Sequence, residues 1–141
     1  MTAHGTARTM EKHHDLAVQR GPVVIIDDDV AVRDSLKFSL EIEGFSVCVW
    51  GSGQEFLNES GPPSYGCLIV DQNMPGLSGL DLIAILRGRK IFAPAILITS
   101  HPNRALRERA ANAGIPIVEK PLLNETLVDG IRHALAQPRS R

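Results

Sequence analysis

Four short apolar runs in this chain each end in polar residues that can do chemistry. These residues are Asp27, Asp28 and Asp29 after the first run, Asp71 after the second, Thr99 and Ser100 after the third, and Lys120 after the fourth. Carboxylates crowded at one point repel one another, and a cation, a lysine partner or a raised pKa relieves that repulsion. A hard divalent ion such as Mg²⁺ takes oxygen ligands and often combines one or two carboxylates with waters and a phosphate. If the fold gathers these side chains, they predict a site for Mg²⁺ and a phosphoryl group.

Helix capping is the simpler explanation for an acid that follows a strand. An Asp at the start of a helix accepts hydrogen bonds from backbone amides and complements the helix dipole. Capping explains one of the three acids at 27–29, but it does not explain Asp71 and Lys120 as well. We therefore expect capping and a cation site side by side.

The apolar patterns indicate which elements must position these residues. Strands are predicted at 23–26, 45–50, 67–70, 95–99 and 117–118. A helix signal follows each strand. Apolar residues spaced by four mark the first and last helices, at Val32, Leu36 and Leu40 and at Leu127, Ile131 and Leu135. Capping motifs, Ser52 with Glu55 and Ser78 with Asp81, mark the second and third, and the fourth helix is predicted at 103–113. Five βα units predict an α/β fold with a parallel sheet and helices on both faces. Ligands bind such sheets at the carboxyl ends of the strands, so the polar residues should lie along one edge.

The composition excludes several classes of protein. The chain has 141 residues, of which 43% are hydrophobic and 22% charged, and its formal net charge of −1 gives no overall attraction to nucleic acid or anionic lipid. The apolar runs span about half a dozen residues, against roughly 20 for a membrane-spanning helix, and the N-terminus lacks the apolar core of a secretory signal. We therefore expect a cytoplasmic protein. Cys48 and Cys67 lie in apolar runs without metal-binding spacing, which predicts two buried, reduced thiols.

The N-terminal residues are predicted to form a disordered extension, because they show no apolar period. His4, His13 and His14 are interpreted as part of this solvated tail rather than as a metal site, since adjacent histidines would point apart on a helix. The five units use about 115 residues, which leaves no room for a second domain. The predicted boundaries are 1–21 for the extension, 22–137 for the domain and 138–141 for a C-terminal tail.

Four motifs together carry a resemblance to a known family. They are IIDDD, CLIVDQNMPGLSG, ILITS and VEKP, in that order. Over residues 22–137 the chain resembles the receiver domain of two-component response regulators, with FixJ-like regulators as the nearest in character. The resemblance implies a doubly wound, five-stranded parallel sheet of the flavodoxin-like or CheY-like (βα)5 type, with strand order 2-1-3-4-5. It also implies a phosphorelay signalling domain that catalyses only its own phosphorylation and slow dephosphorylation.

The same resemblance implies roles for the acidic residues. Asp71 would be the phosphoacceptor and would attack the phosphoryl group of a kinase phosphohistidine. Asp27 and Asp28 would hold Mg²⁺ directly or through water, and Asp71 and the backbone carbonyl of Asn73 would complete the protein ligands.

Three further residues receive roles around the phosphoryl group. Thr99 would hydrogen-bond a phosphoryl oxygen, Lys120 would pair with Asp71 and then with the phosphate, and the small Ser100 would leave the phosphoryl group room. These roles also make chemical sense apart from the resemblance, because phosphoryl transfer needs in-line positioning and neutralisation of negative charge.

Two features depart from the family pattern. Relatives usually carry an aromatic residue three positions before the lysine, whereas this chain has Ile117. The stretch 114–120 is also one residue shorter than is common and contains Pro116. Because isoleucine is β-branched and stiff, we expect it to stay packed when the domain is activated and to mute the response at the fifth strand.

Other classes of protein fit the residues less well. A Mg²⁺-dependent phosphatase with an Asp nucleophile would place a second Asp two positions after the first, but this chain has Asn73 there. A flavin-binding module would need a glycine- and hydroxyl-rich phosphate loop after the first strand, where three acids would repel a phosphate. A phosphate sink or a relay intermediate remains an alternative to a receiver with its own output.

The resemblance also implies partners. A sensor histidine kinase or a histidine phosphotransfer protein would supply the phosphoryl group, and an unnamed downstream protein would receive the signal. Because the chain ends at Arg141, shortly after the last predicted helix, it is predicted to be a stand-alone receiver without a DNA-binding domain. The family's usual partner or dimer surface includes the 103–113 helix, which here offers Arg104, Arg107, Glu108 and Arg109 to a possible homodimer.

Overall fold

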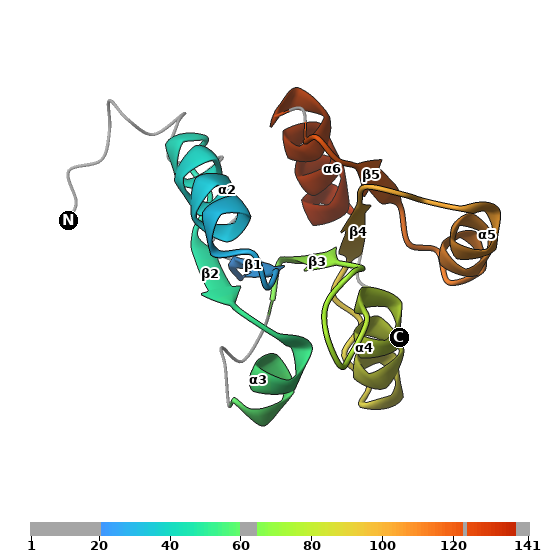
Figure 1. Ribbon diagram of the computed structural model, residues 1–141. Coiled ribbons are helices and arrows are strands. Elements are labelled where there is room, and N and C mark those ends of the chain that lie inside the picture. The colour runs from blue at the N-terminus through green and yellow to red at the C-terminus, as the bar shows by residue number, and fades with distance from the viewer. Residues whose placement is uncertain (1–20, 60–64, 123, 138–141) are drawn as a thin grey trace.

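Five parallel strands form the centre of the computed structural model, which describes residues 21–59, 65–122 and 124–137. The strands are β1 (Val23–Ile26), β2 (Val47–Trp50), β3 (Cys67–Asp71), β4 (Ala95–Thr99) and β5 (Ile117–Glu119), and they lie side by side in the order β2-β1-β3-β4-β5. The helices are α2 (Val30–Ile42), α3 (Gly53–Asn58), α4 (Gly79–Gly88), α5 (Arg104–Asn112) and α6 (Asn124–Ala136), as Figure 1 shows. The predicted doubly wound sheet and its strand order are confirmed.

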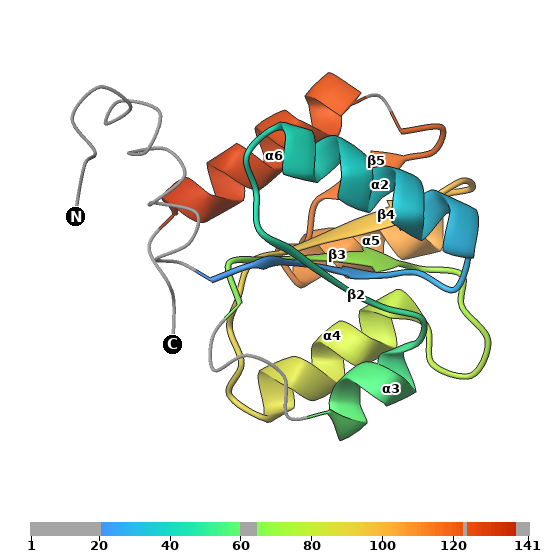
Figure 2. The same cartoon turned by 90° about the vertical axis from the view of Figure 1, so that its left-hand side faces the viewer.

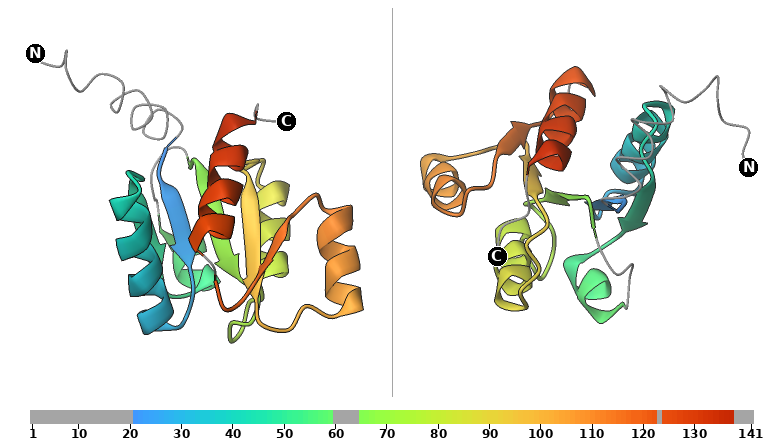
Figure 3. Two further views of the ribbon diagram at one scale, coloured as in Figure 1. Left: turned by 90° about the horizontal axis from the view of Figure 1, so that it is seen from above. Right: turned by 180° about the vertical axis from the view of Figure 1, so that it is seen from behind.

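Helices cover both faces of the sheet, with α2 and α6 on one face and α3 and α4 on the other (Figure 2). Because successive side chains of a strand point to opposite faces, β1 supplies Val23 and Ile25 to one core and Val24 and Ile26 to the other. Ala110 of α5 belongs to the same core as α4. Figure 3 shows α5 at the β5 edge of the sheet and α2 at the β2 edge. All four residues of β1 are buried, as the uninterrupted β-branched run predicted.

Side chains cap the helices where the sequence predicted. The Asp29 side chain accepts hydrogen bonds from two amides of the first turn of α2, so capping does explain one of the three consecutive acids. Ser52 and Ser78 cap α3 and α4 by accepting from the amides of Glu55 and Asp81. These caps fix the starts of the helices that follow β1, β2 and β3.

Two expectations about β2 need correction. The strand begins at Val47 rather than at residue 45, because Phe45 leaves the sheet and packs into the core shared by α2 and α6. Cys67 is fully buried, but the prediction of a buried thiol was wrong for Cys48, which is only half-buried because β2 lies at the edge of the sheet.

Some of the predicted segments lie outside the described ranges. The predicted extension apart from Gly21, with its three histidines, and the predicted tail at 138–141 fall there. Within the described ranges, no helix combines the length and the apolar character needed to cross a membrane.

Candidate functional site

The carboxyl ends of four strands bring the predicted polar residues to one edge. Parallel pairing sets Ile26 beside Val70 and Thr99 beside Glu119, so the strands end at nearly the same level. The residues that follow or close these strands are therefore neighbours, as expected at the switch point of a doubly wound sheet. They are Asp27 and Asp28 after β1, Asp71 at the end of β3, Thr99 at the end of β4 and Lys120 after β5.

Asp27, Asp28 and Asp71 form an acidic cluster. One carboxylate oxygen from each lies within 4.8 Å of the others. Asp27 and Asp71 are buried, whereas Asp28 is exposed and opens the cluster to solvent. The Oδ1 of Asp27 accepts a hydrogen bond from the Asp29 amide at 2.9 Å, and the Oδ1 of Asp71 accepts one from the Asn73 amide at 3.3 Å. Each buried carboxylate is thus oriented by its own loop.

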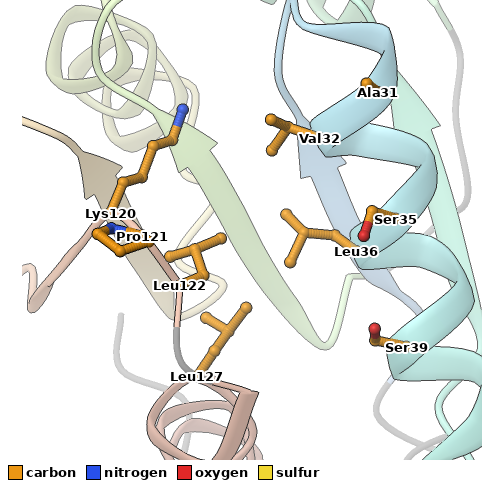
Figure 4. Close-up of a pocket in the computed structure, with 9 residues that line it drawn as sticks. All are labelled: Ala31, Val32, Ser35, Leu36, Ser39, Lys120, Pro121, Leu122 and Leu127. Carbon is orange, nitrogen blue, oxygen red and sulfur yellow. The ribbon is translucent and has the colours of Figure 1, made fainter.

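Lys120 supplies the positive charge that balances this cluster. Figure 4 shows its side chain extending from the end of β5 toward the end of β3. Its Nζ lies 3.6 Å from the Oδ1 of Asp71 and 3.7 Å from the Oδ2 of Asp27. The Lys120 amide donates to the Thr99 carbonyl at 2.9 Å, which ties the base of the side chain to β4. One cation therefore bridges the two buried carboxylates.

A pocket lies beside Lys120 between α2 and the segment from β5 to α6, with a volume of about 460 Å³ (Figure 4). Its walls are mostly apolar. They consist of Ala31, Val32, Ser35, Leu36 and Ser39 from α2, together with Lys120, Pro121, Leu122 and Leu127. The acidic edge is therefore flanked by open space on the α2 side.

The Asp71 carboxyl group has a pKa raised from its ordinary 3.8 to about 6. Burial is the largest cause, because it penalises the charged form, and the neighbouring Asp27 carboxylate adds to the increase. Lys120 and the Asn73 amide act in the opposite direction and lower the pKa of Asp71. The net increase shows that the lysine only partly compensates two buried acids, so a further cation would be stabilised here.

We expect Asp71→Asn to stabilise the metal-free protein at neutral and alkaline pH. Because the folded-state pKa of Asp71 is raised, its charged form destabilises the fold, and this cost develops as pH rises from about 4 to about 6. At about pH 8 the variant should exceed the parent by on the order of 2 kcal/mol in the free energy of unfolding, whereas near pH 4 the two should be nearly equal. Denaturant unfolding without metal measures this difference. Asp129→Asn, at an exposed position on α6, is the control and should unfold like the parent.

Thr99 and Asn73 are joined by a contact that the sequence analysis missed. Thr99 is buried, and its Oγ1 accepts hydrogen bonds from the Asn73 Nδ2 at 3.1 Å and from the His101 amide at 3.4 Å. Ser100 is exposed at the same edge. Only the backbone carbonyl of Asn73 was predicted to matter, because the pattern gave no signal that its amide would reach across 26 residues to Thr99.

Arg33 is a second residue that the sequence analysis missed. It lies on α2, and its Nη1 donates to the Asp27 carbonyl at 3.0 Å. The residue resembles any other charged position on a helix, so no motif pointed to it. The structure nevertheless places its guanidinium against the loop that carries the acids.

The donor set of this edge fits Mg²⁺. All available side-chain ligands are carboxylate oxygens, which a hard divalent ion prefers. The Oδ2 of Asp27 is buried and has no hydrogen-bond partner among the described residues, and only the Lys120 ammonium faces it. Such an oxygen is stabilised by a cation, and the exposed Asp28 would allow bound waters to complete the coordination.

The charged side chains of α5 largely pair with neighbours. Arg104 pairs with Glu108, and Arg107 and Arg109 reach across to Glu119 and Asp81. All of these pairs are more than half exposed, so they contribute little to stability. A homodimer through this helix stays a prediction.

The fold and this site define a doubly wound α/β domain with an acidic centre at its switch point, and comparison with known proteins identifies its family. The family model described as "Response regulator receiver domain" matches residues 23–132. The chain therefore belongs to the response regulator receiver family, as the four sequence motifs implied.

Individual relatives agree with this assignment. The transcriptional regulatory protein FixJ of Bradyrhizobium diazoefficiens is 34% identical over 119 residues, which cover 84% of this chain and 58% of FixJ. FixJ of Azorhizobium caulinodans is 37% identical over 117 residues, covering 82% of this chain and 56% of that protein. The chain thus spans a little over half the length of these curated relatives.

Solved structures show the same architecture. The crystal structure of FixJ-N has a TM-score of 0.77 and 33% identity, covering 86% of this chain and 98% of that one. The chemotaxis protein CheY4 of Vibrio cholerae has a TM-score of 0.74 and 22% identity, covering 81% of this chain and 98% of CheY4. The second likeness concerns the fold alone.

Proposed function

We propose that this receiver domain accepts a phosphoryl group on Asp71 from the phosphohistidine of a sensor kinase or a histidine phosphotransfer protein in the cytoplasm. The observation that carries the proposal is the position of Lys120, which bridges Asp71 and Asp27 at 3.6 and 3.7 Å. The proposal is supported by the carboxylates of the acidic cluster and the Lys120 ammonium, which lie around one point and would serve as nucleophile, cation site and counter-charge. Phosphoryl transfer depends mainly on such positioning and charge neutralisation.

The acidic cluster would hold Mg²⁺. Asp27, Asp28 and Asp71 supply the carboxylate oxygens, and the backbone carbonyl of Asn73 is the fourth proposed ligand. When bound, the ion neutralises negative charge on the phosphoryl oxygens and orients the group for in-line transfer. The proposal for Asn73 is supported by its amide, which binds the Asp71 carboxylate and keeps the loop close to the cluster.

The transfer step uses this chain's own groups as follows. A carboxylate oxygen of Asp71 attacks phosphorus, a P–O bond forms, and the P–N bond to the donor histidine breaks. The histidine nitrogen takes the electron pair and later a proton from water. Lys120 then pairs with the phosphoryl oxygens, Thr99 donates its hydroxyl hydrogen to one of them, and the small side chain of Ser100 leaves space. The role of Thr99 is supported by its hydrogen bond with Asn73, which keeps the end of β4 next to the Asp71 loop.

Transfer of the signal to a partner is favoured over the alternatives. The relatives are named as transcriptional regulatory proteins, which supports a receiver that reports to an output rather than a phosphate sink or relay. A phosphatase would need a general acid two residues after Asp71, and that position is occupied by Asn73, whose amide is bound to Thr99. Because this chain lacks that general acid, the phosphoryl group on Asp71 should not be hydrolysed continuously.

A small phosphodonor distinguishes these functions directly. Incubation with acetyl phosphate and Mg²⁺, followed by intact mass measurement and a phosphate-release assay, should show one acid-stable, base-labile phosphoryl group per chain. Continuous release of phosphate with no accumulated phosphoprotein would support the phosphatase instead. A chain that gains no phosphoryl group with this donor, with and without Mg²⁺, would contradict the proposal.

We expect Lys120→Ala to retain part of the phosphorylation but to lose the structural response. The carboxylates and the cation site remain, so the transfer should be slower but still measurable. The response should be lost because the Lys120 side chain would contact the phosphoryl group while the Lys120 backbone, which follows β5, is hydrogen-bonded to Thr99. The Lys120 side chain would therefore link the phosphoryl group to β5. Amide hydrogen exchange before and after phosphorylation measures this. Lys37→Ala removes a surface ion pair with Glu41 and should respond like the parent, whereas a full response in Lys120→Ala would refute the link.

We expect the response to phosphorylation to centre on the loop from Thr99 to Arg104. Ile117 is half-buried and packs against the core beneath α4, so this short, stiff side chain leaves β5 little room to rearrange. A phosphoryl mimic should therefore alter hydrogen exchange in the loop and the start of α5 more than in β5 or α6. Equal changes across Ile117 and the 127–135 segment would show that isoleucine does not mute the response.

A further inference from the structure

The backbone of Asp27 is held from two sides. Its amide donates to the Trp50 carbonyl at 3.2 Å, which extends the pairing of β1 with β2. Its carbonyl accepts a hydrogen bond from the Nη1 of Arg33 at 3.0 Å. The first contact belongs to the sheet, but the second depends on one side chain of α2. The position of the loop that carries the acidic cluster therefore depends on Arg33.

The guanidinium of Arg33 is used in an unusual way. No carboxylate in the described part of the chain forms an ion pair with it, and its Nε is buried without a hydrogen-bond partner. Burying a cationic group with an unsatisfied donor costs stability. Among the described residues, the hydrogen-bond partner of this half-buried arginine is a backbone carbonyl at the edge of the candidate site. Such an arrangement is explained if the position of that carbonyl matters.

Gly51 makes room for this arrangement. A Cβ atom built on Gly51 would lie 2.9 Å from the Nη1 of Arg33, which is closer than real side chains approach. The contacted atom is the far end of a flexible side chain, so an alanine here can be accommodated by moving the guanidinium. The absence of a side chain at Gly51 and the position of Arg33 are therefore parts of one contact, in which an α2 side chain lies between Gly51 of the β2–α3 loop and the Asp27 carbonyl.

We infer that Arg33, lodged against Gly51, is a positioning residue for the proposed Mg²⁺ site. By fixing the Asp27 carbonyl, it sets the turn from which the Asp27 and Asp28 side chains project toward Asp71. Groups that orient metal ligands without touching the metal commonly change metal affinity by 10- to 100-fold when removed. The inference rests on the proposed function, because it concerns the same cation site.

The test is the dissociation constant for Mg²⁺, measured on the folded, unphosphorylated chain by calorimetric titration. The fluorescence of Trp50, the single tryptophan of the sequence, provides a second readout. Arg33→Ala should weaken Mg²⁺ binding about tenfold. Gly51→Ala keeps the arginine but displaces its guanidinium, and it should weaken binding in the same direction. The double variant should be no weaker than Arg33→Ala alone, because both changes disrupt one contact.

Arg87→Ala is the matched control. Arg87 is also a half-buried arginine whose Nη1 donates to a backbone carbonyl, that of Ile91 at 2.9 Å, but it lies at the end of α4 away from the acidic edge. Its loss should leave the Mg²⁺ dissociation constant unchanged. If the loss of a half-buried arginine acted only through general stability, both Arg33→Ala and Arg87→Ala would have a lower unfolding temperature, and neither would bind Mg²⁺ more weakly in the folded state.

The outcomes separate the inference from the proposed function. If the parent protein and Arg87→Ala bind Mg²⁺ and Arg33→Ala or Gly51→Ala binds it equally well, the positioning role of Arg33 is wrong and the site stands. Independent, additive effects of the two substitutions would also overturn the proposed contact. If the parent protein binds no Mg²⁺, the metal site of the proposed function fails, and the inference fails with it.

Discussion

Asp71→Asn is expected to abolish the incorporation of phosphoryl groups from acetyl phosphate. An amide lacks the negatively charged oxygen that attacks phosphorus. Among the described residues, Asp27 is the one other carboxylate that is buried, pairs with Lys120 and belongs to the acidic cluster. The Asp27 side chain is fully buried, whereas that of Asp71 keeps 5% exposure, so Asp71 is the better placed of the two for attack on an incoming phosphoryl group. Intact mass after incubation with the donor and Mg²⁺ measures the effect.

Asp81→Asn is the control for this experiment. Asp81 is an exposed carboxylate in the first turn of α4, where it pairs with Arg109. Its variant should be phosphorylated to the same extent as the parent. Persistent incorporation by Asp71→Asn, at a rate near that of the parent, would show that another side chain is the acceptor.

The second large effect is expected for Asp28→Asn. Asp28 is the exposed member of the acidic cluster, so the substitution removes one carboxylate from the proposed cation site and leaves both buried acids in place. The phosphorylation rate at a fixed Mg²⁺ concentration should fall by on the order of 100-fold, because less negative charge is neutralised during transfer. The fold should be unchanged or slightly more stable, since one source of carboxylate repulsion is removed. Phosphorylation kinetics and thermal unfolding without metal measure the two effects.

The neighbouring residue provides a close control. Asp29 carries the same carboxylate one position later, but it caps α2 and lies outside the cluster. Asparagine caps helices as well as aspartate does, so Asp29→Asn should retain both the fold and phosphorylation. If Asp29→Asn lost as much activity as Asp28→Asn, the effect would belong to the loop as a whole and not to a metal ligand.

The fold could be predicted from local patterns because each pattern reflects burial. The continuous β-branched run of β1 became a strand covered on both faces, and Leu127, Ile131 and Leu135, spaced by four, all face the core in α6. Such a pattern does not predict burial for a residue that lies at the edge of the sheet. The half-buried Cys48 has the same apolar neighbours in sequence as a buried strand residue, and only the strand order places it at the edge.

The proximity of the site residues was predictable for a related reason. Parallel strands of similar length end together, so an acid that follows β1, an acid at the end of β3 and a lysine that follows β5 must be near one another. The sequence alone could not show how their neighbours are oriented. The bonds from Asn73 to Thr99 and from Arg33 to the Asp27 carbonyl depend on side-chain conformations set by packing between distant segments. Neither has a characteristic spacing along the chain.

The most direct test of the central claim is to locate the phosphoryl group. The protein is incubated with acetyl phosphate and Mg²⁺, the acyl phosphate is trapped by borohydride reduction, and the modified residue is found by peptide mass spectrometry. We predict a single modified residue, Asp71 at the end of β3, and no modification when Mg²⁺ is removed with a chelator. Modification at Asp27, Asp28 or a residue outside the acidic cluster, or equal modification of Asp71 without Mg²⁺, would contradict the account.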